Sequence, residues 1–521
     1  GLPDGNHIDN ANMGTPPDGM RPTMQMYLQH QPGTSYPDED PFAPTNVGDE
    51  ADTVYHEYTH GLSNRLVVDV QGGSTLGGVQ AGSMGEAWSD WYAMDYLVAH
   101  GFQKDKPGVA DVVLFQYDGE GVYYDRTEPI DCAVKQPSRR CTGGSTGHRA
   151  GYTYADYGKV VGAPEVHGDG EIWAQTLWQL RHALGSKATE SLVTRAMELA
   201  PYDPSFLDMR NAILVADTNV YGGDHHAKIW KTFAKRGMGF YAGSLGGEDS
   251  QPGASFAVPP TSRTRGYVTG TVTDSQTHDP LSGVPVTLAF QGRGEANPTA
   301  ITDAHGHYRL GPVPAGRYRK LTVSGGGFQP VTRAVTVTGG DTTVGFRLVR
   351  DYAASSGGAS VTEATGTDYT AYGCGPDLAI DLSQATGWVT NAGVTDAETK
   401  TVVPKHFTVD LGRQIEVNSL GVDPTSACGV GGSASTAGYT IETSPDNVTF
   451  TPAASGTFTV ADQGRLNSVT PTGATSHVRY VRFTITSNQT PDPATNCPGG
   501  GYGGCSYVSM SELEVFGTPT P

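Results

Sequence analysis

Between residues 55 and 61 the chain reads Tyr55-His56-Glu57-Tyr58-Thr59-His60-Gly61. An α-helix has about 3.6 residues per turn, so histidines four positions apart project from one face and can hold the same metal ion. Acidic residues at positions 49, 50 and 52 precede this run and Arg65 follows it, which is the charge distribution favoured at the two ends of a helix. The run therefore predicts a metal-binding helix with His56 and His60 as ligands.

A second acidic segment follows a glycine-rich stretch and reads Met84-Gly85-Glu86-Ala87-Trp88-Ser89-Asp90. Apolar residues recur from Trp88 to Leu97 at helical spacing, which predicts a second amphipathic helix beginning near Glu86. A catalytic zinc ion needs three protein ligands and one open position, and Glu86 is the predicted third ligand. Asp90 lies one turn further along the same face, where we expect it to accept the other ring N–H of zinc-bound His56.

Glu57 follows the first predicted ligand and faces the open side of the metal, so we predict that it is the general base. The alternative is that this motif is only solvated surface charge on a helix. A closed structural zinc site is disfavoured because such sites are mostly filled by cysteine and histidine, and no cysteine lies between Gly1 and Ile130.

Three motifs occur in order in the first half of the chain: HEYTHGLSNRL at 56–66, GSMGEAWSDW at 82–91 and PEVHGDGEIWAQTLWQLR at 164–181. Together they resemble the fungalysin family of secreted zinc metallopeptidases, which are relatives of thermolysin. The resemblance implies a thermolysin-like α+β domain with a mostly α C-terminal lobe and endopeptidase activity on extracellular proteins. It also implies that Glu86 is the downstream zinc ligand and that His167 is catalytic, stabilising the oxyanion. The alternative for His167 is a solvated residue at a helix start.

The chain departs from the thermolysin pattern because residues 61–85 contain no tyrosine that could help to bind the oxyanion. Tyr152, Tyr154 and Tyr157 stay open as substitutes, against the alternative that they are packing residues. Upstream, Asn10, Ala11 and Asn12 resemble the edge segment with which thermolysin relatives hold an extended substrate; the alternative is an ordinary Asn-rich turn. Since only 55 residues precede His56, we expect the β-rich N-terminal subdomain of the family to be incomplete, either because the chain was cleaved or because its upstream part is a separate piece. The family's propeptide is also missing from the sequence, which suggests a processed form.

The chain has 521 residues, with 34 basic and 54 acidic side chains and a net charge of −20. This balance argues against nucleic-acid and anionic-membrane partners, and no apolar run approaches the roughly 18 residues of a transmembrane segment. Even numbers of cysteines in each region favour disulfides and an oxidising, extracellular compartment. Local pairs Cys132–Cys141 and Cys497–Cys505 are our first expectation, which leaves Cys374 with Cys428, although spacing alone leaves other pairings open.

Four segments divide the chain. Residues 1–245 are predicted as the metallopeptidase domain, with further helices at 188–199, 204–217 and 224–236. His225 and His226 are expected to be solvated residues at the start of the last helix. Residues 246–265 are predicted as a linker. Residues 266–350 alternate like strands and resemble a carboxypeptidase regulatory-like β-sandwich, while residues 351–521 resemble a discoidin-like, galactose-binding-type jelly roll.

Two functions of different class follow from these features. The first is a secreted zinc endopeptidase acting on proteins or peptides, whose C-terminal modules attach to a substrate, a glycan, or a cell-surface or matrix ligand. The second is a non-catalytic adhesin or glycan-binding protein that keeps the metallopeptidase fold, and an intact Glu57 favours the first. Loop tyrosines that could stack on a sugar are Tyr369, Tyr372, Tyr502 and Tyr507. The run Asp38–Asp40 could hold Ca²⁺ or be merely solvated; cleavage preference and oligomeric state stay open.

Overall fold

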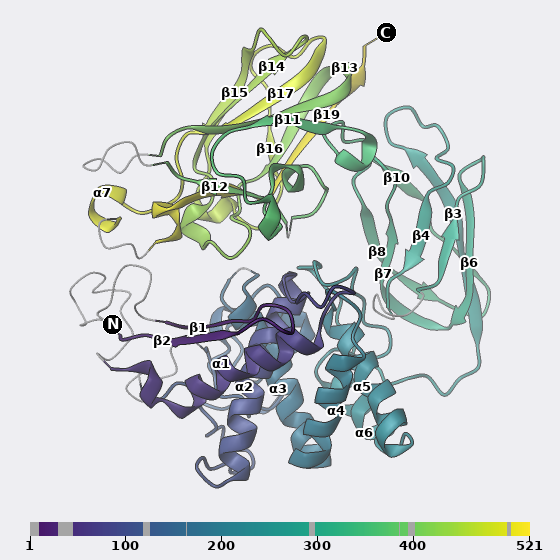
Figure 1. Ribbon diagram of the computed structural model, residues 1–521. Helices are drawn as coiled ribbons and strands as arrows, with labels where there is room; N and C mark the ends of the chain where they lie inside the picture. The colour runs from purple at the N-terminus through teal and green to yellow at the C-terminus, as the bar shows by residue number, and fades with distance from the viewer. Residues whose placement is uncertain are drawn as a thin grey trace.

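The computed structural model describes residues 10–29, 45–117, 126–162, 164–290, 297–384, 386–393, 402–497 and 502–520. Figure 1 shows a helical domain at the start of the chain, a small β domain in the middle and a larger β domain at the end. The predicted multidomain architecture, a mostly helical domain followed by two β domains, is confirmed. Among the described residues, no helix combines the length and the apolar character that crossing a bilayer requires.

Six helices build the first domain: α1 (Ala51–Leu66), α2 (Val79–Ala99), α3 (Val166–Leu184), α4 (Ser186–Glu198), α5 (Phe206–Tyr221) and α6 (His226–Lys235). A short antiparallel pair, β1 (Ala11–Gly14) and β2 (Thr23–Met26), lies against α1. Helix α2 packs against both α1 and α3, and four fully buried tryptophans fill the core of the domain: Trp88, Trp91, Trp173 and Trp178. These three helices carry every residue predicted to bind metal or to catalyse.

Helix α2 begins at Val79 rather than near Glu86, so our predicted start is wrong by two turns. The glycines at 82 and 85 have low helix propensity, which favours a loop in isolation. In the folded protein a Cβ on Gly82 would lie 3.0 Å from the Val166 side chain. The missing side chain therefore allows α2 to pass close to the start of α3, and tertiary packing overrides local propensity.

Gly170 plays a similar part on α3. A Cβ at this position would lie 2.8 Å from the backbone oxygen of Ser83 and 3.4 Å from Cβ of Glu86. Because an added side chain would separate α3 from α2 at this point, glycine allows the first turn of α3 to reach Glu86. The later helices match the predicted segments, with ends shifted by one to four residues; for example, a capping box between Ser205 and Asp208 starts α5 at Phe206.

The middle domain consists of two sheets with one core between them. Strands β10 (Phe346–Leu348), β3 (Arg265–Asp274) and β6 (His307–Pro314) form the first, and β9 (Asp341–Thr343) also pairs with β3. The second has the order β5 (Thr299–Ile301), β4 (Pro285–Leu288), β7 (Gly316–Val323) and β8 (Val331–Val337). Burial alternates along β6 and β7, as expected for strands with one face toward a core.

The segment 246–265, predicted as a linker, makes several fixed contacts. The buried carboxylate of Asp249 pairs with the buried Lys320 ammonium on β7 at 2.6 Å. Close by, the Tyr241 hydroxyl donates to the Ala315 carbonyl at 2.6 Å, and isolated bridges join Gly243 to Gly253 and Met238 to Ser255. The first domain is therefore bonded to the β-sandwich through this segment.

The C-terminal domain is built around the long strand β13 (Lys405–Asp423). The larger sheet has the order β11 (Ser360–Ala364), β13, β17 (Val478–Ile485), β14 (Gly438–Ser444) and β15 (Thr451–Thr457), with β16 (Asn467–Val469) and β19 (Glu512–Pro519) also pairing with β13. Strands β12 (Trp388–Asn391) and β18 (Tyr507–Met510) form a second sheet, and a short helix, α7, spans Pro493–Asn496. Apolar residues of both sheets share one core.

All six cysteines are paired. The disulfides join Cys132 to Cys141, Cys374 to Cys428 and Cys497 to Cys505, so the expected connectivity is confirmed. Each bridge lies within one domain, and the first closes a loop of the helical domain.

Candidate metal centre

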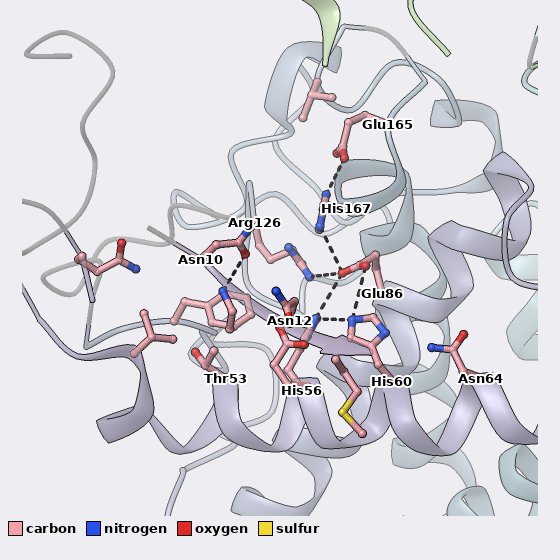
Figure 2. A pocket seen from close by; sticks show the side chains of 17 residues that line it. Asn10, Asn12, Thr53, His56, His60, Asn64, Glu86, Arg126, Glu165 and His167 are labelled. Atoms are coloured by element: carbon pink, nitrogen blue, oxygen red, sulfur yellow. Dashed lines mark hydrogen bonds and ion pairs between the residues drawn. The ribbon is translucent and has the colours of Figure 1, made fainter. Parts of the chain in front are cut away.

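Helices α1 and α2 bring three predicted ligands together (Figure 2). The Nε2 atoms of His56 and His60, one turn apart on α1, are 3.0 Å from each other. Glu86 on α2 places Oε2 3.3 Å from Nε2 of His56 and Oε1 3.5 Å from Nε2 of His60. All three side chains are largely buried, and their donor atoms converge on one point.

The spacing of these donors fits zinc. Nitrogen and oxygen ligands lie about 2.0–2.2 Å from a tetrahedral zinc ion, which sets them roughly 3.3–3.6 Å from one another. The three distances here, 3.0, 3.3 and 3.5 Å, are close to that range. Two imidazoles and one carboxylate are also a donor set that leaves the fourth position free for chemistry.

His56 is oriented by a buried acidic partner. Its Nδ1 atom lies 2.8 Å from Oδ1 of Asp90, which turns Nε2 toward Glu86, as predicted from the spacing on α2. Arg126 binds both oxygens of Asp90, with Nη2 2.8 Å from Oδ1, and its Nη2 lies 3.5 Å from Oε2 of Glu86. Burial alone would raise the pKa of Asp90, but the charges of Arg126 and His56 hold it below its usual value.

Arg126 was not predicted from the sequence. It belongs to no recognisable motif, and it reaches the site only because the chain folds back over α2 after residue 125. Its guanidinium also lies 5.3 Å from the centre of the Phe115 ring, whose edge faces His56 at 5.8 Å. Nothing in the sequence around Arg126 indicates that its side chain lies beside the metal ligands.

Glu57 lines the same cleft as the three ligands and is buried. Burial raises the pKa of its carboxyl group to about 7; the charge of His56 opposes this rise and that of Glu86 adds to it. A carboxyl group with a pKa near neutrality is suited to both accepting and returning a proton.

His167 lies in the first turn of α3 and is half-exposed. Its Nε2 atom lies 3.4 Å from Oε2 of Glu86, and its Nδ1 atom lies 2.6 Å from Oε1 of Glu165. Burial would lower the pKa of His167, but the carboxylates of Glu86 and Glu165 raise it. Glu165 also caps α3 through Gly168 N, so the helix start holds the half-exposed imidazole beside the ligands.

These side chains line a cleft of about 660 Å³. Asn10, Ala11 and Asn12, at the start of β1, form part of its wall. In the described part of the chain, the strand paired with β1 is β2, so the second edge of β1 borders the cleft. The predicted ligands, base, histidine and edge segment thus meet in one place.

Comparison with known proteins agrees with this geometry. Residues 2–242 match the profile of the fungalysin metallopeptidase (M36) family. They form a fungalysin domain. Residues 267–349 match the carboxypeptidase regulatory-like domain and residues 359–498 the F5/8 type C domain, so the three resemblances inferred from the sequence are confirmed.

Similar curated proteins are extracellular metalloproteinases of fungi. Extracellular metalloproteinase 2 of Arthroderma gypseum is 33% identical over 258 residues, covering 45% of this chain and 36% of the relative. The protein of the same name from Arthroderma otae is 34% identical over the same shares. The chain thus spans about a third of the length of these relatives.

Solved structures resemble the C-terminal part. The C-terminal domain of a Bacteroides fragilis chitobiase is 18% identical, covering 31% of this chain and 95% of that chain, with a TM-score of 0.23. Chitosan-binding module 1 of a chitosanase/glucanase from Paenibacillus sp. is 24% identical, covering 32% of this chain and 99% of that one, with a TM-score of 0.22.

The three tyrosines considered as oxyanion partners are packing residues of the fungalysin domain. Tyr152 and Tyr154 are fully buried and Tyr157 is nearly so. Tyr154 stacks on Phe206 at 5.5 Å, and Tyr157 meets the same ring edge-on at 5.5 Å. None of the three lines the cleft.

The remaining histidine candidates lie outside the cleft. His225 and His226 each place Nδ1 2.9 Å from the buried Asp217 carboxylate, outside the cleft, which fits their expected role at a helix start. The run Asp38–Asp40, considered for Ca²⁺, lies outside the described residues.

Proposed function

We propose that this chain carries the catalytic centre of a secreted zinc endopeptidase that cleaves extracellular proteins or peptides. The observation that carries the proposal is the convergence of His56, His60 and Glu86 within 3.0–3.5 Å of one another, with Glu57 in the same cleft. The names of the curated relatives supply the extracellular setting, and the three disulfides agree with it.

Zinc, when held by these three ligands, polarises the scissile carbonyl and makes the attacking water more acidic. Glu57 takes the proton that this water releases and delivers a proton to the amine that leaves. Its burial supports the role, because a desolvated carboxylate is a stronger base than one in water.

His167 stands on the opposite side of Glu86 from α1 and donates toward the carbonyl oxygen as that oxygen gains negative charge. Glu165 accepts a hydrogen bond from Nδ1, so Nε2 can donate only from the imidazolium cation; the carboxylates of Glu86 and Glu165 raise the pKa of His167 and so favour that cation. A donor positioned for the developing charge stabilises the transition state more than the ground state.

Substrate binding is assigned to β1. The N–H of Tyr27 donates to the Asn10 carbonyl, so the backbone of Asn10 faces β2. Since neighbouring residues of a strand point their amide groups to opposite sides, the N–H and C=O groups of Ala11 and Met13 point away from β2. The Ala11 N–H donates to Oδ1 of Asn10 at 2.8 Å, a bond that an incoming peptide would replace. An extended peptide can add to this edge, with Asn10 and Asn12 beside it.

The C-terminal domain is proposed to attach the enzyme to a glycan or another surface ligand. The Tyr372 side chain is 80% exposed, and its ring lies 6.2 Å from Tyr369, which in turn lies 6.0 Å from Tyr507. An exposed aromatic beside a second ring, which itself contacts a third, can stack on a sugar face. Loss of retention on immobilised polysaccharide in Tyr372→Ala would support this role, and unchanged retention would remove it.

The main test compares cleavage of casein by the longest natural form of the protein, by Glu57→Gln and by the exposed control Glu190→Gln. We expect Glu57→Gln to lose about 10²–10⁴-fold in rate with zinc content unchanged. Chelation should abolish wild-type cleavage and added zinc should restore it. Zinc-loaded wild type that cleaves nothing would instead favour the alternative of a non-catalytic binding protein, and a fully active Glu57→Gln would refute the assigned base.

A further inference from the structure

Besides the zinc ligands, the described residues contain a second convergence of carboxylates in the fungalysin domain. Asp105, Asp111 and Asp131 each offer one oxygen, and these oxygens all lie within 4.8 Å of one another. Asp105 and Asp111 follow the end of α2, while Asp131 directly precedes the disulfide-bonded Cys132. Asp105 and Asp111 are close in sequence, whereas Asp131 comes from further along the chain, so the fold brings it to the other two.

Backbone amides hold two of these carboxylates in place. Asp131 accepts from Val112 N at 3.1 Å and from Asp111 N at 3.2 Å, using one oxygen for each. Asp111 accepts from Lys106 N at 3.0 Å. The orientation of both groups is therefore fixed by the main chain rather than by a cationic side chain.

Asp105 supplies an independent indication of a missing partner. Its side chain is only 8% exposed, and Oδ2 lies 2.7 Å from Nε2 of His182 and 3.6 Å from Nη1 of Arg181. The other oxygen, Oδ1, is buried and has no hydrogen-bond partner. A buried carboxylate oxygen without a donor is costly, and a bound cation beside it would remove that cost.

We propose that Asp105, Asp111 and Asp131 bind a calcium ion. Calcium takes oxygen ligands at about 2.3–2.6 Å, so two oxygens on one ion are at most roughly 4.6–5.2 Å apart, which the cluster satisfies. The absence of any imidazole or thiolate from the three ligands disfavours zinc. Three carboxylates offset by Arg181 leave a net charge that a divalent cation balances.

The electrostatics of Asp131 agree with this assignment. Burial raises the pKa of its carboxyl group against the hydrogen bonds from Val112 and Asp111, and the charge of Asp105 raises it further. A divalent cation among the three groups would remove that repulsion.

The ion would join the two ends of the segment between Asp111 and Asp131, which contributes side chains to the proposed zinc site. Between Asp111 and Asp131 the chain carries Phe115, whose ring faces His56, and Arg126, which binds Asp90. The two ends of this segment are also hydrogen-bonded to each other, because Ile130 N donates to the Val112 carbonyl at 3.0 Å. Calcium at this place would hold the base of the loop from which Phe115 and Arg126 reach the catalytic residues.

The test measures calcium bound per chain by equilibrium dialysis and elemental analysis, in zinc-loaded protein carrying Glu57→Gln so that self-cleavage cannot interfere. We compare this parent with the same protein bearing Asp131→Asn, or Asp111→Asn, and with a matched exposed control, Asp224→Asn. The parent and the control should bind one more calcium ion per chain than either cluster variant. Their thermal unfolding midpoint should also rise more when calcium is added.

Asp111→Asn is the second arm because Asp111 accepts one backbone hydrogen bond whereas Asp131 accepts two, so this variant should fold even if Asp131→Asn does not. Equal calcium content in parent and folded cluster variants would overturn the proposal, as would an equal calcium-dependent shift of the midpoint. Magnesium at the same concentration should compete weakly, because it prefers octahedral geometry and retains its water. The readout is bound metal, so it stands even if the chain cleaves no peptide.

Discussion

Nδ1 of His56 lies 2.8 Å from Oδ1 of Asp90, while the same carboxylate is held by Arg126 from its other side. The buried row Arg126–Asp90–His56 therefore fixes the tautomer and the direction of a zinc-ligating ring. Such partners commonly contribute as much to metal affinity as a change of ligand geometry does.

Asp90→Asn should weaken zinc binding by about 10–100-fold, because the amide is a poorer acceptor for the His56 N–H and leaves Arg126 without its charged partner. Competition with a chromophoric chelator measures the affinity. Asp279→Asn, an exposed change in the β-sandwich, serves as control. An Asp90→Asn protein with wild-type affinity would show that Asp90 does not orient the ligand.

Arg126→Lys keeps the charge but loses the planar fork that binds both oxygens of Asp90 and the face-on contact with Phe115. We expect kcat/KM to fall by about tenfold or more, which corresponds to about 1.4 kcal/mol of transition-state stabilisation. The exposed Arg139→Lys variant should match the wild type. Peptide-cleavage kinetics on zinc-saturated protein decide the outcome, and unchanged kinetics in Arg126→Lys would refute it.

Ala11→Pro removes one of the two β1 backbone N–H groups, those of Ala11 and Met13, that point away from β2; in the free protein it donates to Oδ1 of Asn10. Proline is tolerated on edge strands, so the domain should stay folded. Loss of a main-chain hydrogen bond to an extended substrate should raise KM by about tenfold, on the order of 1 kcal/mol. Ala11→Val, which keeps the N–H, is the matched control. If both variants raise KM equally, the effect is steric and strand addition is not the binding mode.

Glu171 on α3 accepts hydrogen bonds from the backbone of Thr127 and Glu128, the two residues after Arg126. Burial raises its pKa to about 8, against opposing effects of the Thr127 hydrogen bond and the Arg126 charge. Because the folded pKa lies above the ordinary value, the stability this group contributes is full below about pH 4.5. It is lost as the pH rises through 8.

Glu171→Gln should therefore flatten the dependence of the thermal unfolding midpoint on pH between 4.5 and 8.5. Each kcal/mol removed from this dependence corresponds to about 2–4 °C for a domain of this size. The exposed Glu190→Gln variant should keep the wild-type profile. A Glu171→Gln profile that merely shifts downward in parallel would mean that Glu171 is not the titrating group.

The parts of the site that sequence could predict are those encoded locally. His56 and His60 follow from helical spacing, and Asp90 follows from Glu86 by one turn of the same helix. Phe115 and Arg126 could not be found this way, because their positions depend on how a long excursion packs onto α2. The cluster of the Asp105, Asp111 and Asp131 carboxylates could not be predicted from the sequence for the same reason.

The type of fold could be predicted from the sequence, but not the places where two helices come into close contact. Strand alternation and helical periodicity identify the three domains, since one face of each element must be buried. Gly82 and Gly170 resemble loop or neutral residues in sequence, yet each permits two helices to come within contact distance. Whether a glycine weakens a helix or brings it close to a neighbour depends on what lies opposite, which sequence alone does not tell.

The buried pair of Asp249 and Lys320 has a consequence for how the enzyme meets large substrates. The Asp249–Lys320 ion pair and the hydrogen bond from Tyr241 to Ala315 restrict rotation of the helical domain relative to the β-sandwich. If the C-terminal domain binds a surface ligand, the cleft can then reach only those peptide bonds that the fixed arrangement of the domains brings to it.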